Sequence, residues 1–237
     1  MKIVTIHQPE HLPYLGFFHK VSMVDTLILL DNVQYEKNYF QNRNRVNTAD
    51  GARFVTIPVT NTHGPISEVR LADNARHYCR KNAATIQAAY QSTPYWQDYG
   101  FELLQLLADH RTQTLSLYNE KLLRWLFDVL GINVSIIRAS ELAVQGAKTD
   151  LLIDICHKVG ATKYISGRSG RDYLNLSKFD IPVEFQDFKH PVYTQWGKSC
   201  FEPNMSVIDA LFNVGPDIMK IIKTANYGKR KEPGQTP

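Results

Sequence analysis

The sequence predicts an α/β fold with a predominantly parallel sheet, and three observations lead to this expectation. Residues 1–6 and 26–30 are short apolar runs separated by a segment with a helical pattern. The same order of strand, helix and strand returns between residues 133 and 166. Each apolar run ends in a polar segment, as strands do at the edge of a sheet where ligands bind. With 237 residues, 43% of them hydrophobic and 21% charged, the chain can bury a full core.

The first strand opens directly into a polar loop, His7 to Gly16, with two histidines, a glutamine and two prolines. Pro9 and Pro13 fix φ and lack a backbone N–H donor, so we expect a rigid loop. A helix should follow over residues 17–25. The loop then places imidazoles and an amide at the carboxyl end of the sheet. The alternative is a proline turn that the histidines merely cap.

The second strand, residues 26–30, is apolar throughout, as expected of a buried strand parallel to the first. It ends in a polar segment, residues 31–37, that begins with Asp31 and contains Gln34. Two neighbouring strand ends would form one site. Asp31 could equally cap a helix or a turn.

A small antiparallel unit is predicted over about residues 38–71. Asp50-Gly51 is a hairpin signal between strands at 38–46 and 53–59, and the alternating residues 66–71 suggest a third strand. Arg43 and Arg45 are two residues apart, so on a strand they share a face that could bind phosphate or carboxylate. The alternative is a solvated edge strand.

A helical insertion is predicted over about residues 74–131. Apolar residues recur at helical spacing over 76–91, 95–110 and 114–130. Gly131 follows the third helix and suits the residue after a helix C-terminus.

The α/β pattern resumes with a strand at 133–137, a helix at 149–159 and a strand at 163–166. The segment after it contains Ser166, Gly167, Arg168, Asp172 and Tyr173. Glycines let backbone N–H groups approach a phosphate. The segment is neither a Walker A loop nor a dinucleotide-binding fingerprint.

The last predicted strand, residues 181–185, also ends in polar residues. These are Gln186, Asp187, Lys189, His190 and Tyr193, with Asn204 further along. Helices are expected at 207–213 and 215–223. We therefore predict one domain over residues 1–228, built on a Rossmann-like parallel sheet, and a disordered tail over 229–237.

Charge and composition narrow the functional classes. The net charge of +4 fits anionic ligands such as nucleotides but is no strong signal for nucleic acid. The three cysteines, Cys79, Cys156 and Cys200, are far apart and predict neither disulfides nor a zinc site. No run reaches the about 18 apolar residues of a membrane span, and no signal peptide is evident. We expect a cytoplasmic protein.

Several polar strings resemble, in order, those of the WbqC-like family of bacterial proteins. The resembling strings are His7–Pro9, Leu12–Phe18, Asp31–Tyr35, Asn42–Arg45, Ser166–Gly167, Asp172–Leu174, Phe185–Tyr193 and Pro203–Asp209. Tyr14 stands where the family often has Trp, and Thr194 where Pro is common. The resemblance implies a role in the biosynthesis of O-antigen, the outer part of lipopolysaccharide, or of another surface glycan.

A fainter resemblance is to nucleotidyltransferase-like adenylate-forming enzymes, such as pantothenate synthetase, whose fold belongs to the HUP class. Asn32–Tyr35 and Gly167–Tyr173 carry it. This likeness implies ATP with Mg²⁺, which Asp31 or Asp172 could position. The spacing in the first loop departs from the usual His-x-Gly-His.

The leading functional hypothesis is amide-forming acyl or aminoacyl transfer, for example of glycine, to the amino group of a nucleotide-linked amino sugar. We expect His7, Asp187 and His190 to be catalytic, with Asp187 or His190 as the base. The expected substrate-binding residues are Gln8, His11, Tyr14, Lys20, Asp31, Gln34, Arg43, Asn44, Arg45, Ser166, Gly167, Arg168, Asp172, Tyr173, Gln186, Lys189, Tyr193 and Asn204.

Two alternatives stay open. One is a non-catalytic scaffold that binds a nucleotide sugar. The other is a metal-dependent hydrolase with ligands among His7, His11, Asp31, Asp187 and His190, although Pro9 argues against the helix that would put the first two on one face. We predict no metal site. The acyl donor could be an ATP-activated acid, acyl-CoA or aminoacyl-tRNA.

Overall fold

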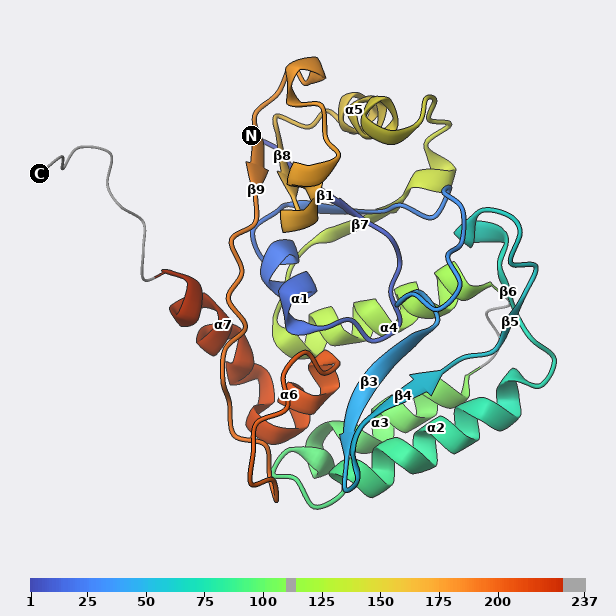
Figure 1. The fold of residues 1–237 in the computed structure, drawn as a ribbon, viewed down its shortest axis with the longest axis vertical. Helices are drawn as coiled ribbons and strands as arrows, with labels where there is room; N and C mark the ends of the chain where they lie inside the picture. The colour runs from blue at the N-terminus through green and yellow to red at the C-terminus, as the bar shows by residue number, and fades with distance from the viewer. Residues whose placement is uncertain (110–113, 228–237) are drawn as a thin grey trace, which may run out of the picture.

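A computed structural model describes residues 1–109 and 114–227 and contains the predicted parallel sheet (Figure 1). The strand order is β7–β2–β1–β8–β9, and all neighbours are parallel. The strands are β1 (Ile3–His7), β2 (Thr26–Leu29), β7 (Ser135–Arg138), β8 (Lys163–Ser166) and β9 (Val183–Phe185). Counted along the chain, this is the order 3-2-1-4-5 of a Rossmann-like sheet, and it reverses between β1 and β8. The predicted fold class is confirmed.

Helices lie on both faces of the sheet because side chains alternate along the strands. Leu27 and Leu29 of β2 face the core beneath α1 (Leu15–Val21), whereas Ile28 faces the core beneath α5 (Lys148–Lys158). Figure 1 shows α5 on one side of the sheet and α1 and α4 (Leu115–Leu130) on the other.

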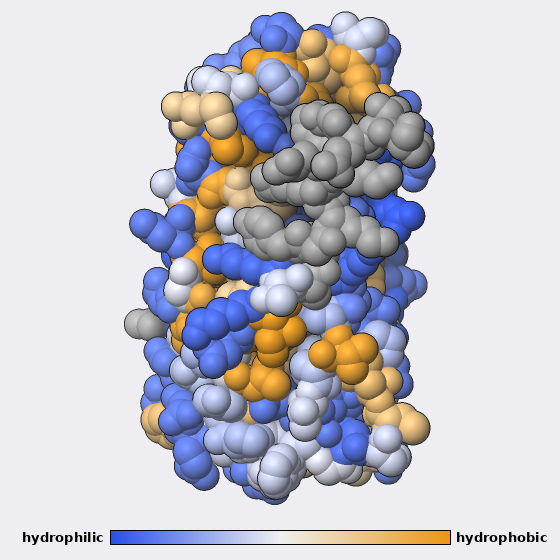
Figure 2. Space-filling view, turned by 90° about the vertical axis from the view of Figure 1, so that its left-hand side faces the viewer, coloured by the Kyte–Doolittle hydropathy of each residue, from blue (hydrophilic) through white to orange (hydrophobic). Residues whose placement is uncertain are grey.

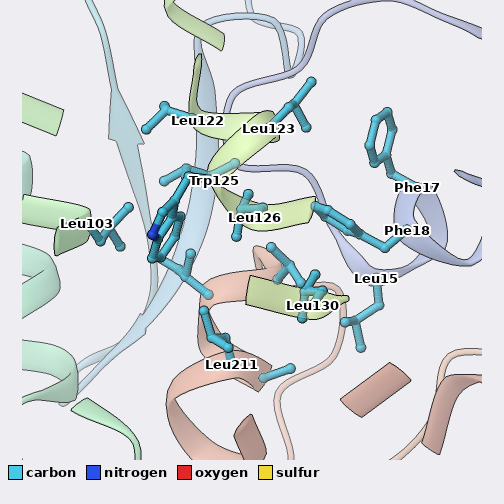
Figure 3. Close-up of a cluster of buried hydrophobic side chains, with 14 of the residues drawn as sticks. Leu15, Phe17, Phe18, Leu103, Leu122, Leu123, Trp125, Leu126, Leu130 and Leu211 are labelled. Carbon is cyan, nitrogen blue, oxygen red and sulfur yellow. The ribbon is translucent and has the colours of Figure 1, made fainter. Parts of the chain in front are cut away.

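The larger core is centred on α4 (Figure 3). Trp125 points toward Leu103 of α3 (Trp96–Ala108), and Phe17 and Phe18 of α1 pack against the opposite side of the helix. Leu211 of α6 (Val207–Val214) closes the cluster from below. Since α4 touches the sheet through α1 and the insertion through α3, it joins the two parts of the chain.

The helical insertion has the predicted elements. They are α2 (Ala75–Tyr90), α3 and α4. Gly131 ends α4 with φ of 65°, a left-handed conformation that glycine adopts without strain. The helix expected over 17–25 begins earlier, at Leu15, and also ends earlier, at Val21. It ends there because Ser22, Met23 and Val24 donate to helix carbonyls in a tight turn before β2.

The antiparallel region differs from its prediction in one respect. The hairpin of β3 (Arg43–Thr48) and β4 (Gly51–Thr56) is present, but β6 (Arg70–Leu71) pairs with β5 (Val59–Thr60) as a separate ladder. The segment before β6 forms η1 (Ile66–Glu68) instead of strand. The N–H groups of residues 66 and 67 donate to the carbonyls of residues 33 and 31, so no strand edge is available there.

The remaining elements are short or lie near the C-terminus. They are η2 (Ala139–Glu141), η3 (Arg168–Asp172), η4 (Leu176–Lys178), η5 (Gly215–Asp217) and α7 (Ile218–Tyr227). The side chain of Ser206 caps α6 by accepting from the N–H of Ile208. The tail predicted over 229–237 lies outside the described residues.

A helix must be long and apolar to span a membrane. Within residues 1–109 and 114–227, every helix falls short of the length and apolar character that crossing a bilayer requires. On the face shown in Figure 2, hydrophobic side chains are interspersed with hydrophilic ones.

Candidate active site

The site lies where the strand order reverses. The chain leaves β1 toward α1 on one face of the sheet. It leaves β8 toward η3 and η4, and η4 lies against α5 on the other face, where Lys178 forms an ion pair with Asp150. Connections that diverge in this way open a crevice at the carboxyl ends of the two strands.

Two adjoining chambers occupy this crevice. The larger has a volume of about 870 Å³ and lies beside α1. The smaller has a volume of about 690 Å³ and lies beside α5. Their common wall consists of His7, Glu10, Lys20, Tyr39, Gly167 and Ser169.

A chain of hydrogen bonds runs through the common wall. The Lys20 ammonium donates to His7 Nδ1 at 2.8 Å, and His7 Nε2 lies 3.0 Å from Glu10 Oε1. Because Nδ1 accepts from Lys20, Nε2 carries the hydrogen and donates to Glu10. Lys20 is only 3% exposed. The sheet thus positions the imidazole, and α1 brings the amine to it.

Burial lowers the pKa of both Lys20 and His7. Loss of hydration lowers the pKa of Lys20 to about 8, although the charge of Glu10 opposes the shift. The pKa of His7 is lowered by burial and next by the charge of Lys20, against the effect of Glu10. A neutral imidazole and an amine that titrates near neutral pH are suited to proton transfer.

Cations dominate the larger chamber. Arg45, Arg168, Arg171 and Lys20 line it together with the carboxylates Glu10 and Asp172. The Arg45 guanidinium donates to the carbonyl of Asn204 at 3.1 Å, and that of Arg171 lies 4.6 Å from the centre of the Phe185 ring. Guanidinium groups held in this way can bind phosphate bidentately.

Buried amides hold the loops of the larger chamber. Asn44 donates to the carbonyl of Leu12 at 2.8 Å, and Leu12 has φ of 45°, a conformation that is costly without such support. Gln186 donates to the carbonyl of Gly16 at 2.7 Å. Tyr14 also lines this chamber. Asn44 and Gln186 line the chamber as well, and their hydrogen bonds hold its loops in place.

The smaller chamber is lined by apolar and polar side chains. The aliphatic residues Leu30, Val33, Leu151 and Leu152 are among them, and we call these four the floor. Gln8, Ser166 and Tyr173 also line this chamber. The Gln8 side-chain oxygen accepts a hydrogen bond from Gln41 at 2.8 Å, which fixes the orientation of the amide.

Several residues expected in the site lie outside both chambers. The carboxylate of Asp31 accepts from Ser116 Oγ at 2.9 Å and from the N–H and Oγ of Ser140, so it links the end of β2 to α4 and η2. Gln34 donates to the carbonyls of Tyr35 and Thr62.

Arg43 lies outside both chambers. Its guanidinium donates to the carbonyl of Asn38 and lies 4.4 Å from the centre of the Phe54 ring. Arg45 therefore lines the larger chamber and Arg43 does not, although the two residues were expected to share one face of a strand.

His11 is buried away from the chambers. Its ring is stacked on Tyr118 at a centroid distance of 6.1 Å, and burial lowers its pKa to about 4 against the smaller effect of Asn119. Among the described residues, neither ring nitrogen makes a hydrogen bond of normal geometry. Its backbone N–H donates to the carbonyl of Phe40, which links the first loop to the second.

The polar segment after β9 is mostly used in local packing. His190 Nδ1 bonds to the carbonyl of Pro191, and its Nε2 accepts from the N–H of Asn204. The Tyr193 hydroxyl donates to Asp209 at 2.7 Å. Asp187 and Lys189 are exposed. In the described part of the chain, Gln186 and Asn204 are the predicted residues of this segment that line a chamber.

Other wall residues were not among the expected site residues. They are Ile6, Glu10, Gly16, Phe17, Glu36, Tyr39, Phe40, Lys148, Tyr164, Ser169, Arg171 and Phe188, besides the four residues of the floor. Glu10 could have been recognised from its place three residues after His7 in a loop fixed by prolines. Tyr39 and Phe40 had no such signal because their position depends on the left-handed conformation of Asn38, with φ of 64°.

The residues considered as metal ligands do not form a cluster. Across residues 1–109 and 114–227, no three side chains of His, Cys, Asp or Glu come close enough to hold one ion. Of those five residues, only His7 lines a chamber.

Comparison with known proteins agrees with the resemblance in the polar strings. The model of the WbqC-like protein family matches residues 8–221. The chain belongs to the WbqC-like family. It is also 31% identical over 231 residues to the uncharacterized protein Rv1507c of Mycobacterium tuberculosis, with 93% of this chain and 98% of that protein covered. No solved structure matches significantly. Family membership is thus shown, and the matched range contains most of both chambers.

Proposed function

We propose that this WbqC-like protein is an N-acyl or aminoacyl transferase that acts on the amino group of a nucleotide-linked amino sugar in surface-glycan biosynthesis. The observation that carries the proposal is the pair of chambers with the Lys20–His7–Glu10 chain as their common wall. Acyl transfer needs two substrates that meet at one proton-accepting group.

The larger chamber suits the nucleotide-linked sugar. Arg45, Arg168 and Arg171 supply charge for a diphosphate, and Tyr14 and Tyr39 supply rings on which a base or sugar can stack. Its volume of about 870 Å³ is sufficient for a ligand of that size.

In the proposed reaction, residues of the common wall move and hold the proton. The nitrogen of the amino sugar attacks the acyl carbon, an N–C bond forms, and the bond from the acyl carbon to its carrier breaks. Neutral Lys20 accepts the proton that the nitrogen loses and passes it to the leaving group. His7 holds the amine of Lys20 in place, and Glu10 fixes the His7 tautomer.

The residues that could hold ATP and Mg²⁺ are narrowed by the geometry. Asp31 already accepts hydrogen bonds from two serine side chains and one backbone N–H. Asp172 lines the larger chamber beside Arg168 and Arg171. If ATP supplies the activation, we propose that Asp172 positions the metal.

The test is a two-part assay with purified protein. Thermal shift would detect binding of UDP- and dTDP-linked amino sugars, and mass spectrometry would detect amide product with acyl-CoA, with ATP plus a free acid, or with aminoacyl-tRNA. We expect product with one donor and its loss in Lys20→Gln. Lys81→Gln, an exposed position on α2, is the control.

Binding of a nucleotide sugar without product in any donor mixture would overturn the transferase and favour the scaffold. If the Lys20→Gln variant still forms product, the role of Lys20 is overturned and the transferase proposal stands.

A further inference from the structure

The two chambers differ in the balance of charged residues that line them. Among described residues, the larger chamber has four cationic side chains, Lys20, Arg45, Arg168 and Arg171, and two carboxylates. The smaller chamber has two cations, Lys20 and Lys148, and two carboxylates, Glu10 and Glu36. A polyphosphate therefore finds surplus positive charge in the larger chamber only.

We propose that the smaller chamber binds the acyl group of the donor and that this group is short, aliphatic and uncharged. The inference rests on the proposed transfer and adds the class of the donated group. The anionic part of the donor's carrier lies outside this chamber, because its lining offers no excess of cations.

The floor supplies the selection for aliphatic groups. Leu151 and Leu152 lie on α5 and are almost fully buried, whereas Leu30 and Val33 are only partly buried and present apolar surface to a ligand. When an acyl chain lies on this surface, the apolar surfaces of both the chain and the chamber are removed from water. Each methylene should therefore strengthen binding about fourfold.

A polar lining residue can hold an acyl oxygen. Gln41 fixes the oxygen of the Gln8 amide, so the NH₂ group of Gln8 can donate to the ligand. Ser166 also lines the chamber, but its Oγ is buried, so we assign the acyl oxygen to Gln8.

Gly170 makes room for the Ser166 hydroxyl itself. A Cβ at position 170 would come within 2.2 Å of Ser166 Oγ. The φ of Gly170 is not positive, so the need for glycine here is one of space.

Methyl NMR on protein labelled at leucine and valine can locate the acyl group directly. The probes are acetamide, propionamide and butyramide, which are uncharged, and UDP. We expect butyramide to shift the methyl signals of Leu30, Val33, Leu151 and Leu152, with affinity rising about fourfold per methylene. UDP should not displace butyramide.

Two variants test the assignment. Val33→Phe fills the chamber and should weaken butyramide binding about tenfold, while UDP binding stays within about twofold because the larger chamber is unchanged. Leu151→Ala removes part of the floor and should also weaken it. Competition between UDP and butyramide, the same affinity for all three amides, or unchanged methyl signals would overturn the proposal.

Failure of the acyl site and failure of the transfer are distinguishable. If the transfer assays yield no product but butyramide binds as described, the transfer is wrong and the apolar site stands. If product forms but Val33→Phe leaves the preference among donor chain lengths unchanged, the transfer stands and the acyl site is wrong.

Discussion

The polar segments after β1 and β8 differ in role from those after β2 and β9. All four follow the end of a parallel strand and are rich in charged and amide side chains. Those after β1 and β8 supply most of the common wall of the two chambers. The segments after β2 and β9 supply other lining residues, and their Asp31 and Tyr193 are held by internal hydrogen bonds outside both chambers. The common wall lies where the strand order reverses, because the connections from β1 and β8 diverge there.

The largest effect is expected where the chambers meet. Lys20→Gln should lower kcat by about 10²–10⁴-fold because it removes the proton acceptor. In the unsubstituted protein, kcat/KM should rise with pH through about 8, since Lys20 must be neutral to accept a proton. Initial rates over a pH series check both statements, and a flat profile would contradict them.

The next largest effect concerns a strand end outside the chambers. Asp31→Ala leaves buried donors on Ser116 and Ser140 without their acceptor and should lower the free energy of unfolding by about 3 kcal/mol. Urea denaturation measures it. At temperatures where the variant is folded, its affinity for nucleotide sugars should equal that of the unsubstituted protein. A tenfold weaker affinity would place Asp31 in the site.

His11 offers a comparison with His7 in the same loop. Its pKa of about 4 in the folded protein lies below that of an unfolded histidine, so the unfolded state binds more protons between pH 6.5 and 4. The free energy of unfolding should therefore fall across this window as the pH is lowered, by up to about 3 kcal/mol.

His11→Phe keeps a ring against Tyr118 and should remove most of this pH dependence. Denaturation midpoints between pH 4 and 7 check it. An unchanged slope in the variant would assign the acid sensitivity to other groups.

The smallest effect concerns one of several cations. Arg171→Gln should raise KM for the nucleotide sugar by about tenfold, the loss of one charge-assisted hydrogen bond, with a smaller change in kcat. Arg76→Gln, an exposed arginine on α2, should leave KM unchanged. An equal response of both variants would show that only the net charge of the protein matters.

Much of the fold was predictable from local pattern. Apolar runs of four to six residues predicted the parallel strands, and helical spacing with a terminal glycine predicted α4. The prediction of a strand before β6 was wrong because the backbone N–H groups of this segment donate to the carbonyls of residues 31 and 33. That competition between segments has no local signature.

The site was predictable in part. His7 and Lys20 stood out as polar residues beside a strand, but their contact depends on the way α1 packs back over β1. The roles given to Asp187 and His190 stay predictions, and neither residue lines a chamber among the described residues.

The sequence by itself determined the elements, the family and the polar composition of each strand end, because these depend on neighbours a few residues away. Only the tertiary structure decided that β8 pairs with β1, that two of the four polar strand ends supply most of the common wall of the chambers, and that burial brings the pKa of Lys20 to about 8. These properties depend on long-range packing, since a strand pairs and a charge loses its hydration through residues far along the chain.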